Sequence, residues 1–193
     1  MHLVEAATRC LAKGGIGGLT TDRICKEAKV SRGLINHYFD SRDDLLIEIY
    51  RSSLYDTVNA IVEELRRRAD AAELDPEQTL TALVRSNFSD SYFDRQNLLV
   101  WLSLWGEIAK NERLRDTHRQ LYAAYRTELA HQIDAVAAPR GLDVDAPSLA
   151  RSFIALVDGL WLEWCLDPDV ISRDGAEAAS FAFLEARLGP LRR

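Results

Sequence analysis

Residues 20–39 read TTDRICKEAKVSRGLINHYF, and this stretch decides the fold. A threonine at its start can cap a short helix that places Ile24 and Ala28 four residues apart on one face. Ser31 can cap a second short helix, which ends at Phe39. Two short helices joined by a tight turn predict a helix-turn-helix.

The second of these helices carries side chains that suit a DNA-reading helix. Arg32 can donate two hydrogen bonds to guanine, Asn36 can read adenine, and Gly33 lets the backbone approach the groove. For Arg32 the alternative is a solvated surface position. Further predicted DNA contacts are the polar side chains around the two helices, Thr20, Thr21, His37, Tyr38 and Arg42, although Tyr38 could instead belong to the core.

Length and composition favour an all-α globular protein. The 193 residues suffice to bury a core, and only five prolines and ten glycines leave long stretches free to be helical. No stretch is apolar for long enough to span a bilayer, and the first ten residues lack the features of a signal peptide. Three distant cysteines, Cys10, Cys25 and Cys165, indicate buried thiols in a reducing cytoplasm rather than disulfides or a zinc site.

The distribution of charge permits a nucleic-acid partner for the N-terminal part. Residues 1–50 carry seven Lys or Arg and seven Asp or Glu, so their net charge is zero. The formal net charge of −6 therefore lies entirely in residues 51–193.

The rest of the chain predicts further helices. A glycine cluster from Gly14 to Gly18 ends the first helix, and the absence of Gly and Pro from Arg42 to Leu74 predicts one long connecting helix. Asp75 begins a capping-box pattern. Helices are then expected at about 77–92, 95–110, 112–138, 146–166 and 173–188. We divide the chain into a helix-turn-helix domain, 1–45, and a ligand-binding and dimerisation domain, 46–193.

The second domain contains many aromatic residues with carboxylates near them in sequence. Such side chains can hold a quaternary ammonium ligand by cation–π attraction, whereas packing in the core or at a dimer interface is the alternative. The candidate ligand-binding residues are Phe88, Tyr92, Trp101, Trp105, Glu107, Tyr122, Asp158 and Trp161.

The last two predicted helices suit dimerisation. The first has an apolar face wider than a monomeric surface helix needs, and the second offers small side chains for close packing. The candidate dimer contacts are Phe153, Leu156, Leu160, Trp164, Ala179 and Phe183.

Nearly the whole of residues 3–50 resembles the DNA-binding domain of TetR-family regulators. The runs Leu19–Ile24 and Ala28–Phe39, followed by Asp44-Leu45-Leu46, carry this resemblance. Gly33–Phe39, Val100–Trp105 and Ala155–Leu162 are similar to the subgroup of the choline-responsive betaine repressor. The resemblance implies about nine helices, a dimer formed mainly by the last two, and repression that a small ligand relieves.

The sequence departs from the family pattern near the DNA-binding residues. Lys29 stands where glycine is usual, and holding it at positive φ would cost about 1 kcal/mol. Asp40 occupies a position that is often basic. The chain also begins inside its first helix, without the basic residues that commonly precede it, so the DNA affinity is expected to be modest or the start to be truncated.

We therefore expect a cytoplasmic homodimer that binds a near-palindromic operator, responds to a small effector, and has no cofactor, metal or catalytic residue. Glu128 to His131 form one ExxH motif, whereas a di-metal helical bundle needs two such motifs and further glutamates. A helical metal-dependent enzyme remains one alternative, and a constitutive DNA-binding protein without a ligand is the other. The sequence leaves open the operator, the effector, and whether the regulator represses or activates.

Overall fold

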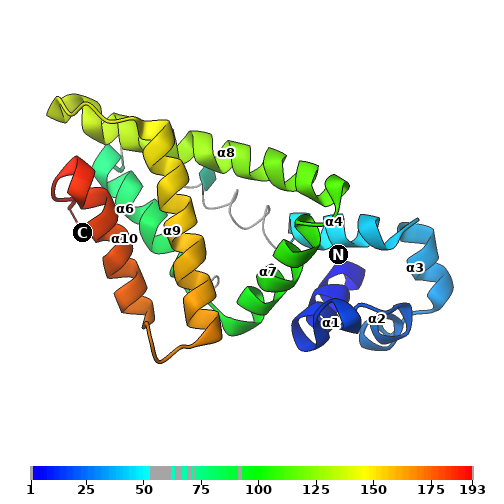
Figure 1. The fold of residues 1–193 in the computed structure, drawn as a ribbon. Helices are drawn as coiled ribbons and strands as arrows, with labels where there is room; N and C mark the ends of the chain where they lie inside the picture. The colour runs from blue at the N-terminus through cyan, green and yellow to red at the C-terminus, as the bar shows by residue number, and fades with distance from the viewer. Residues whose placement is uncertain are drawn as a thin grey trace. The chain divides into compact units, whose positions relative to one another are not determined.

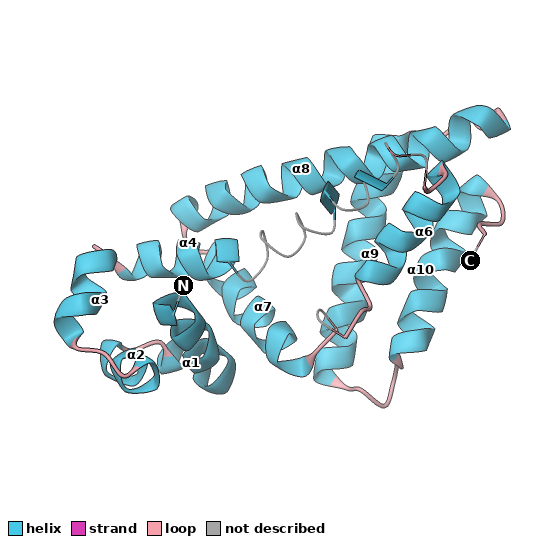
Figure 2. Cartoon of the chain, turned by 180° about the vertical axis from the view of Figure 1, so that it is seen from behind, coloured by secondary structure: helices cyan, strands magenta, loops and turns pink. Residues whose placement is uncertain are grey.

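The structure is a computed structural model that describes residues 2–52, 62–63, 67–68, 71, 73–90 and 93–192. Every regular element within these ranges is a helix, as Figures 1 and 2 show. The predicted all-α fold is therefore confirmed.

The chain divides into two compact units. Unit 1 comprises residues 1–57 and 95–121, and unit 2 comprises residues 58–94 and 122–193. The helices of unit 1 are α1 (His2–Gly18), α2 (Thr21–Ala28), α3 (Arg32–Tyr38), α4 (Arg42–Tyr50) and α7 (Arg95–Ile108). Unit 2 contains α6 (Pro76–Ser86), the 3-10 helix η2 (Ala138–Arg140), α9 (Ala146–Leu166) and α10 (Arg173–Leu188), while α8 (Glu112–Ala137) contributes residues to both units.

The core of unit 1 lies between α1, α4 and α7. α1 buries Val4, Ala7 and Leu11, which recur at the three- to four-residue spacing of a helix face. α4 adds Leu46 and Ile49, both fully buried, and α7 packs along α1. The helix-turn-helix therefore shares a core with α7, which follows much later in the chain.

The core of unit 2 includes the facing sides of α9 and α10, which run side by side (Figure 1). α9 buries Phe153, Val157 and Trp161, and α10 buries Phe181 and Leu184. Both helices have the limits that the sequence predicted.

Capping side chains set several helix starts. Asp75 Oδ1 accepts a hydrogen bond from Gln78 N at 2.9 Å, and Gln78 Oε1 accepts one from Asp75 N at 2.9 Å, which is the predicted capping box. Ser41 Oγ accepts a hydrogen bond from Asp44 N at 3.1 Å. Ser31 occupies the N-cap of α3, but its side chain makes no capping hydrogen bond, so the prediction that it caps this helix is wrong in that respect.

Two residues with positive φ mark chain breaks that the sequence predicted. Gly15, with φ 55° and ψ −157°, interrupts α1 inside the glycine cluster. Lys29, with φ 56° and ψ 45°, ends α2 in the left-handed conformation. In the part of the chain that the structure describes, it is the only residue other than glycine with positive φ.

Helix α6 ends earlier than predicted. α6 stops at Ser86 instead of near residue 92, because Asn87 Nδ2 donates a hydrogen bond to Leu83 O at 2.8 Å and competes for a carbonyl of the last turn. α4 stops at Tyr50, and a π-helical turn follows at residues 51–52. Most of the remaining predicted long helix lies outside the described residues.

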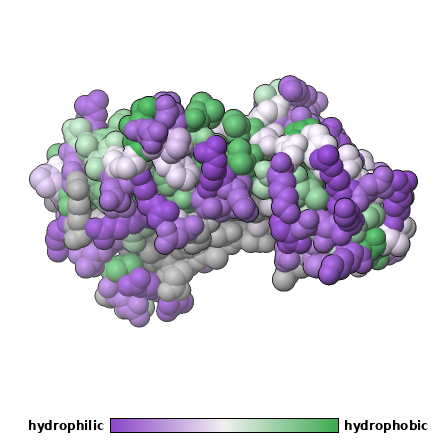
Figure 3. Space-filling view, turned by 90° about the horizontal axis from the view of Figure 1, so that it is seen from below, coloured by the Kyte–Doolittle hydropathy of each residue, from purple (hydrophilic) through white to green (hydrophobic). Residues whose placement is uncertain are grey.

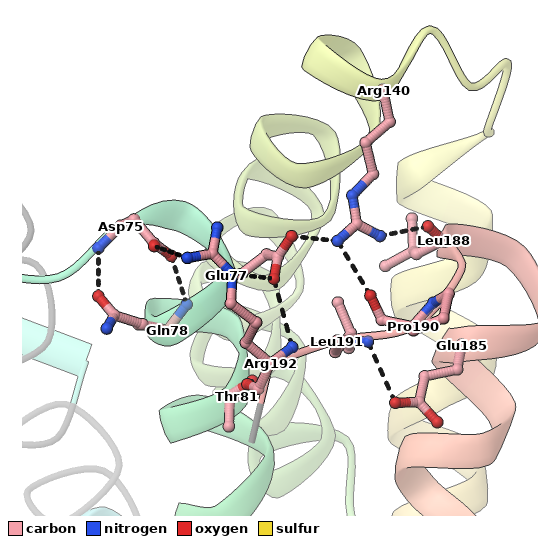
Figure 4. A network of polar contacts seen from close by, with 10 residues as sticks. All are labelled: Asp75, Glu77, Gln78, Thr81, Arg140, Glu185, Leu188, Pro190, Leu191 and Arg192. Carbon is pink, nitrogen blue, oxygen red and sulfur yellow. Dashed lines mark hydrogen bonds and ion pairs between the residues drawn. The ribbon is translucent and has the colours of Figure 1, made fainter.

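A polar network attaches the C-terminal residues to unit 2 (Figure 4). Arg140 donates hydrogen bonds to the Glu77 carboxylate, to Leu188 O, and to Pro190 O at 3.0 Å. Glu77 also accepts hydrogen bonds from Arg192 N at 3.2 Å and from Arg192 Nε at 3.1 Å. The hydrogen bond from Arg140 is the main cause that lowers the pKa of Glu77 below its usual value.

One face of the molecule is largely polar where its residues are described. On the face shown in Figure 3, hydrophilic side chains predominate and hydrophobic ones form separate smaller areas. Among the described residues, no helix combines the length and the apolar character that crossing a membrane requires.

Candidate functional site

The helix-turn-helix leaves almost all of α3 accessible. Of the seven residues of α3, only Ile35 is buried. Tyr38 is 64% exposed and Leu34 is 39% exposed, so the alternative that Tyr38 belongs to the core is excluded. Exposed apolar groups that lie together mark surfaces that another molecule covers.

The predicted DNA contacts all lie on the surface of this module. Thr20 Oγ1 accepts a hydrogen bond from Arg23 N at 3.4 Å and so caps α2. The remaining backbone N–H groups at this helix start suit a phosphate, because a helix N-terminus carries a partial positive charge. The exposed predicted contacts are Thr20, Thr21, Arg32, Gly33, Asn36, His37, Tyr38 and Arg42.

Arg32 is paired with Asp22 in the free protein. Arg32 Nε donates a hydrogen bond to Asp22 Oδ1 at 2.8 Å, and Nη2 contacts the same oxygen. The hydrogen bond to Asp22 raises the pKa of Arg32 above its usual value. Both side chains are exposed, and exposed ion pairs are worth at most about 1 kcal/mol. Arg32 can therefore exchange Asp22 for a base or a phosphate at small cost.

The start of α4 is tied to α7 and α8 by charged side chains. Arg113 Nη2 and Ser41 Oγ each donate a hydrogen bond to the Asp44 carboxylate at 2.6 Å. These bonds, that from Ser41 first, lower the pKa of Asp44 below its usual value. Arg42 Nη2 lies 3.7 Å from Glu107 Oε2. The predicted phosphate contact Arg42 is thus held beside α7.

Trp101 and Trp105 belong to an aromatic cluster within unit 1. Their ring centroids are 5.6 Å apart, and Tyr50 meets Trp101 edge-on with a centroid distance of 6.1 Å. Tyr50 is fully buried, and its hydroxyl lies 2.7 Å from His118 Nδ1. Glu107, predicted as an anionic ligand contact, forms the ion pair with Arg42. The cluster therefore joins α4, α7 and α8 by packing.

A second cluster, within unit 2, is built around Asn87. Trp161 Nε1 donates a hydrogen bond to Asn87 O at 3.1 Å, and Tyr125 OH donates one to Asn87 Oδ1 at 3.3 Å. Burial raises the pKa of Asp158 to about 7. Burial, with a smaller effect from the charge of Asp158, raises the pKa of Tyr125 to about 12. Asp158 therefore lies close enough to Tyr125 for its charge to affect that hydroxyl.

The other predicted ligand contacts are placed separately. Phe88 is buried against Phe93, with a centroid distance of 5.5 Å. The Tyr122 ring lies 5.9 Å from the Arg126 guanidinium, and Tyr92 lies outside the described residues. The structure thus brings Asp158 and Trp161 into one cluster of unit 2, and Trp101, Trp105 and Glu107 into unit 1.

The predicted dimer contacts differ in how far they reach the surface of unit 2. Phe153 is fully buried and packs against Phe183, with a centroid distance of 6.5 Å, while Trp164 stacks on Phe93 at 4.5 Å. Leu156, Leu160, Ala179 and Phe183 are half-buried. The exposed side chains of α10 include Ala178, Ala182 and Ala186.

Three functional candidates were missed by sequence reasoning. Tyr125 follows Tyr122 by three residues and could have been found from that spacing. Asp22 could not have been singled out, because Glu27 and Asp40 both lie nearer to the second helix in sequence. Asn87 gave no signal, because its role depends on helices that are distant in sequence.

A metal-dependent enzyme would need several ligating side chains in one place. Within the ranges that the structure describes, no three His, Cys, Asp or Glu side chains lie together in a way that could hold a metal ion. Glu128 of the ExxH motif accepts a hydrogen bond from Gln132 Nε2 at 2.8 Å. All three cysteines are free thiols; Cys25 is half-buried, whereas the other two are buried as predicted.

Two family models match the chain. The model of bacterial regulatory proteins of the tetR family matches residues 3–49, and the model of the BetI-type transcriptional repressor C-terminal domain matches residues 76–189. The HTH-type transcriptional regulator BetI 1 of Chromohalobacter salexigens is 31% identical over 193 residues, which are 97% of this chain and 89% of the relative. The regulator BetI of Pseudomonas paraeruginosa is 30% identical over 191 residues, covering 97% of this chain and 91% of the relative.

Solved structures of regulators have the same fold. A transcriptional regulator from Pseudomonas aeruginosa PAO1 is 33% identical, with a TM-score of 0.80 over 96% of this chain and 88% of that one. A regulator from Saccharomonospora viridis in complex with choline is 26% identical, with a TM-score of 0.83 over 100% of this chain and 97% of that one. The predicted resemblance is confirmed, and so is the expectation of a regulator rather than an enzyme.

Proposed function

The chain belongs to the tetR family of bacterial regulatory proteins, with a BetI-type repressor C-terminal domain, and on this premise we propose that it is a ligand-released repressor. It binds a near-palindromic operator as a homodimer and dissociates when a quaternary ammonium effector binds. The DNA-binding domain spans residues 1–45 and the effector and dimerisation domain spans residues 46–193. The protein acts in the cytoplasm, where its operator lies.

The exposed recognition helix is the observation that carries the DNA-binding part of the proposal. α3 buries only Ile35, so its outer side chains are available to a groove. Arg32 and Asn36 read base edges, and the flanking polar residues contact phosphates. The exposed ion pair with Asp22 keeps Arg32 ordered without a large cost on release.

A cation site beside Asp158 carries the effector part. The regulator from Saccharomonospora viridis carries choline. In this chain, a half-buried carboxylate near Tyr125 and Trp161 offers both a charge and aromatic rings to such a cation, each ring being worth about 0.5 to 2 kcal/mol. A bound cation favours the ionised form of Asp158, so effector binding releases a proton below pH 7. The remaining predicted effector contacts stay predictions.

The linkage to pH gives a test of the effector site. Choline affinity, measured by titration calorimetry, should rise between pH 5.5 and 7 by up to about tenfold per pH unit and level off above it. Asp158→Asn should remove this dependence and weaken binding. Equal wild-type affinities at pH 5.5 and 8 would contradict the site.

The proposed dimer uses the outward faces of α9 and α10. Small side chains such as Ala182 and Ala186 let helices approach closely, and half-buried Leu156 and Leu160 supply apolar area. Ala182→Glu should give a monomer in analytical ultracentrifugation and reduce operator binding. Ala109→Glu, a change at an exposed alanine of unit 1, is the control and should leave the dimer intact.

The decisive experiment titrates the protein against the DNA immediately upstream of its own gene at 50 and 200 mM salt, with and without choline. Specific, salt-dependent binding of one dimer that choline weakens would support the repressor. Asn36→Ala should lose about 1 to 3 kcal/mol of discrimination against a scrambled site, whereas the exposed control Lys110→Ala should not. Specific binding that choline does not weaken would refute the effector part of the proposal. The absence of specific binding would refute the whole proposal.

A further inference from the structure

Both acidic residues of α2 are occupied by partners. Asp22 accepts a hydrogen bond from Arg32. Glu27 accepts one from Arg9 Nε at 2.7 Å and one from Lys13 Nζ at 3.4 Å, and these bonds lower the pKa of Glu27 below its usual value. The carboxylates of α2 therefore neutralise cations of α1 and α3. The cations of α2 itself have no carboxylate partner.

The uncompensated cations form a stripe along α2. Arg23, Lys26 and Lys29 are exposed, and their side chains make no hydrogen bond or ion pair with any residue in the part of the chain that the structure describes. They follow one another at intervals of three residues, or about 4.5 Å along a helix axis. We call these three residues the α2 basic stripe.

Glycines of the α1 break leave room for one end of the stripe. A Cβ at Gly14 would lie 3.1 Å from Arg23 Nη1, and one at Gly18 would lie 3.5 Å from it. The Arg23 guanidinium thus rests against backbone that carries no side chain.

The stripe borders a pocket of about 570 Å³ between α1 and α2. Four cations and one carboxylate, Lys13, Arg23, Lys26, Lys29 and Glu27, line it, giving a local charge of +3 in a chain whose formal net charge is −6. So positive a surface on an acidic protein fits a polyanion.

We infer that the α2 basic stripe binds backbone phosphates of DNA that flanks the bases read by α3. The inference rests on the proposed function and extends the DNA contact beyond the predicted residues. One end of the stripe, Arg23, follows the predicted contact Thr21 by two residues, and the other end, Lys29, precedes Arg32 by three. In sequence, the stripe therefore lies between the predicted DNA contacts of α2 and those of α3.

The test is the salt dependence of operator binding by the full chain. Each phosphate contact adds about 0.9 to the slope of log affinity against log salt concentration. The triple variant R23Q/K26Q/K29Q should therefore bind with a slope smaller by about 2 to 3. Between 50 and 200 mM salt, wild-type affinity should fall about 40-fold more than that of the variant. The preference for operator over scrambled DNA should remain, because phosphates carry no sequence information.

A matched control separates this contact from net charge. R95Q/K110Q removes two exposed cations that lie outside α2, α3 and the proposed dimer faces and have no hydrogen-bond or ion-pair partner among the described side chains, and it should keep the wild-type slope. An unchanged slope in the stripe variant, or an equal loss of slope in both variants, would overturn the inference. Specific operator binding by the wild type would still support the proposed function. Saturable binding of inorganic pyrophosphate that the stripe variant loses would assign the pocket to a small anion and overturn it too. No operator binding by the wild type would refute both.

Discussion

Replacing Arg140 by methionine should destabilise the protein through the C-terminal network. The side chain donates hydrogen bonds to Glu77, Leu188 O and Pro190 O, and its exposed fraction is only 25%. At about 1 kcal/mol for each net hydrogen bond, the free energy of unfolding should fall by about 3 kcal/mol. For a chain of this size, that corresponds to a melting temperature lower by roughly 6 to 12 °C. Methionine keeps most of the aliphatic packing, so the loss reports on the polar contacts.

The assay is urea unfolding followed by tryptophan fluorescence, with Arg151→Met as the exposed control that should change stability by no more than about 0.5 kcal/mol. A second readout is pH. The folded-state pKa of Glu77 is lower than its unfolded value, so its stabilisation is present above the unfolded pKa and is lost as pH falls through the folded pKa. Arg140→Met should reduce the amount of stability that is lost as pH falls. A stability change equal to that of the control, together with an unaltered dependence of stability on pH below neutrality, would refute this reasoning.

Three further substitutions test individual contacts. Because the pKa of Asp158 is raised to about 7, this residue contributes stability that is lost as pH rises from about 4 to 7. Asp158→Asn should flatten the dependence of the melting temperature on pH. Parallel curves for the two proteins would contradict the raised pKa. Gly18→Ala places a Cβ 2.6 Å from Cys10 O and should cost about 1 to 3 kcal/mol in chemical unfolding, whereas Gly17→Ala meets no atom within 4 Å and should cost nothing; equal effects would argue against the clash. Trp161→Phe removes a buried indole donor and should cost about 1 to 3 kcal/mol, measured by urea unfolding at pH 5; a neutral result would show that its hydrogen bond is dispensable.

Features that depend on neighbouring residues could be predicted from the sequence. α9 and α10 begin where expected because their N-caps, Asp145 and Ser172, accept hydrogen bonds from backbone N–H groups three residues later. The left-handed Lys29 was predictable from the turn it occupies. The exposed residues of α3 also followed from the spacing of one short helix.

Contacts between distant residues could not be predicted. The hydrogen bond from Trp161 to Asn87 spans 74 residues, and that from Arg140 to Glu77 spans 63. The early end of α6 likewise depends on how Asn87 is used by its own helix and by Trp161. Aromatic spacing alone gave no indication that Trp101 and Trp161 belong to different units.

The proposed phosphate contact would make Lys29 a compromise between thermal stability and DNA affinity. Glycine would adopt the same left-handed backbone more easily, so selection for thermal stability alone would favour replacing this lysine. The same change would delete one cation of the α2 basic stripe. Directed evolution of this regulator should therefore lose lysine at this position when only survival of heating is rewarded, and keep it when operator occupancy at low salt is rewarded, where a phosphate contact contributes most.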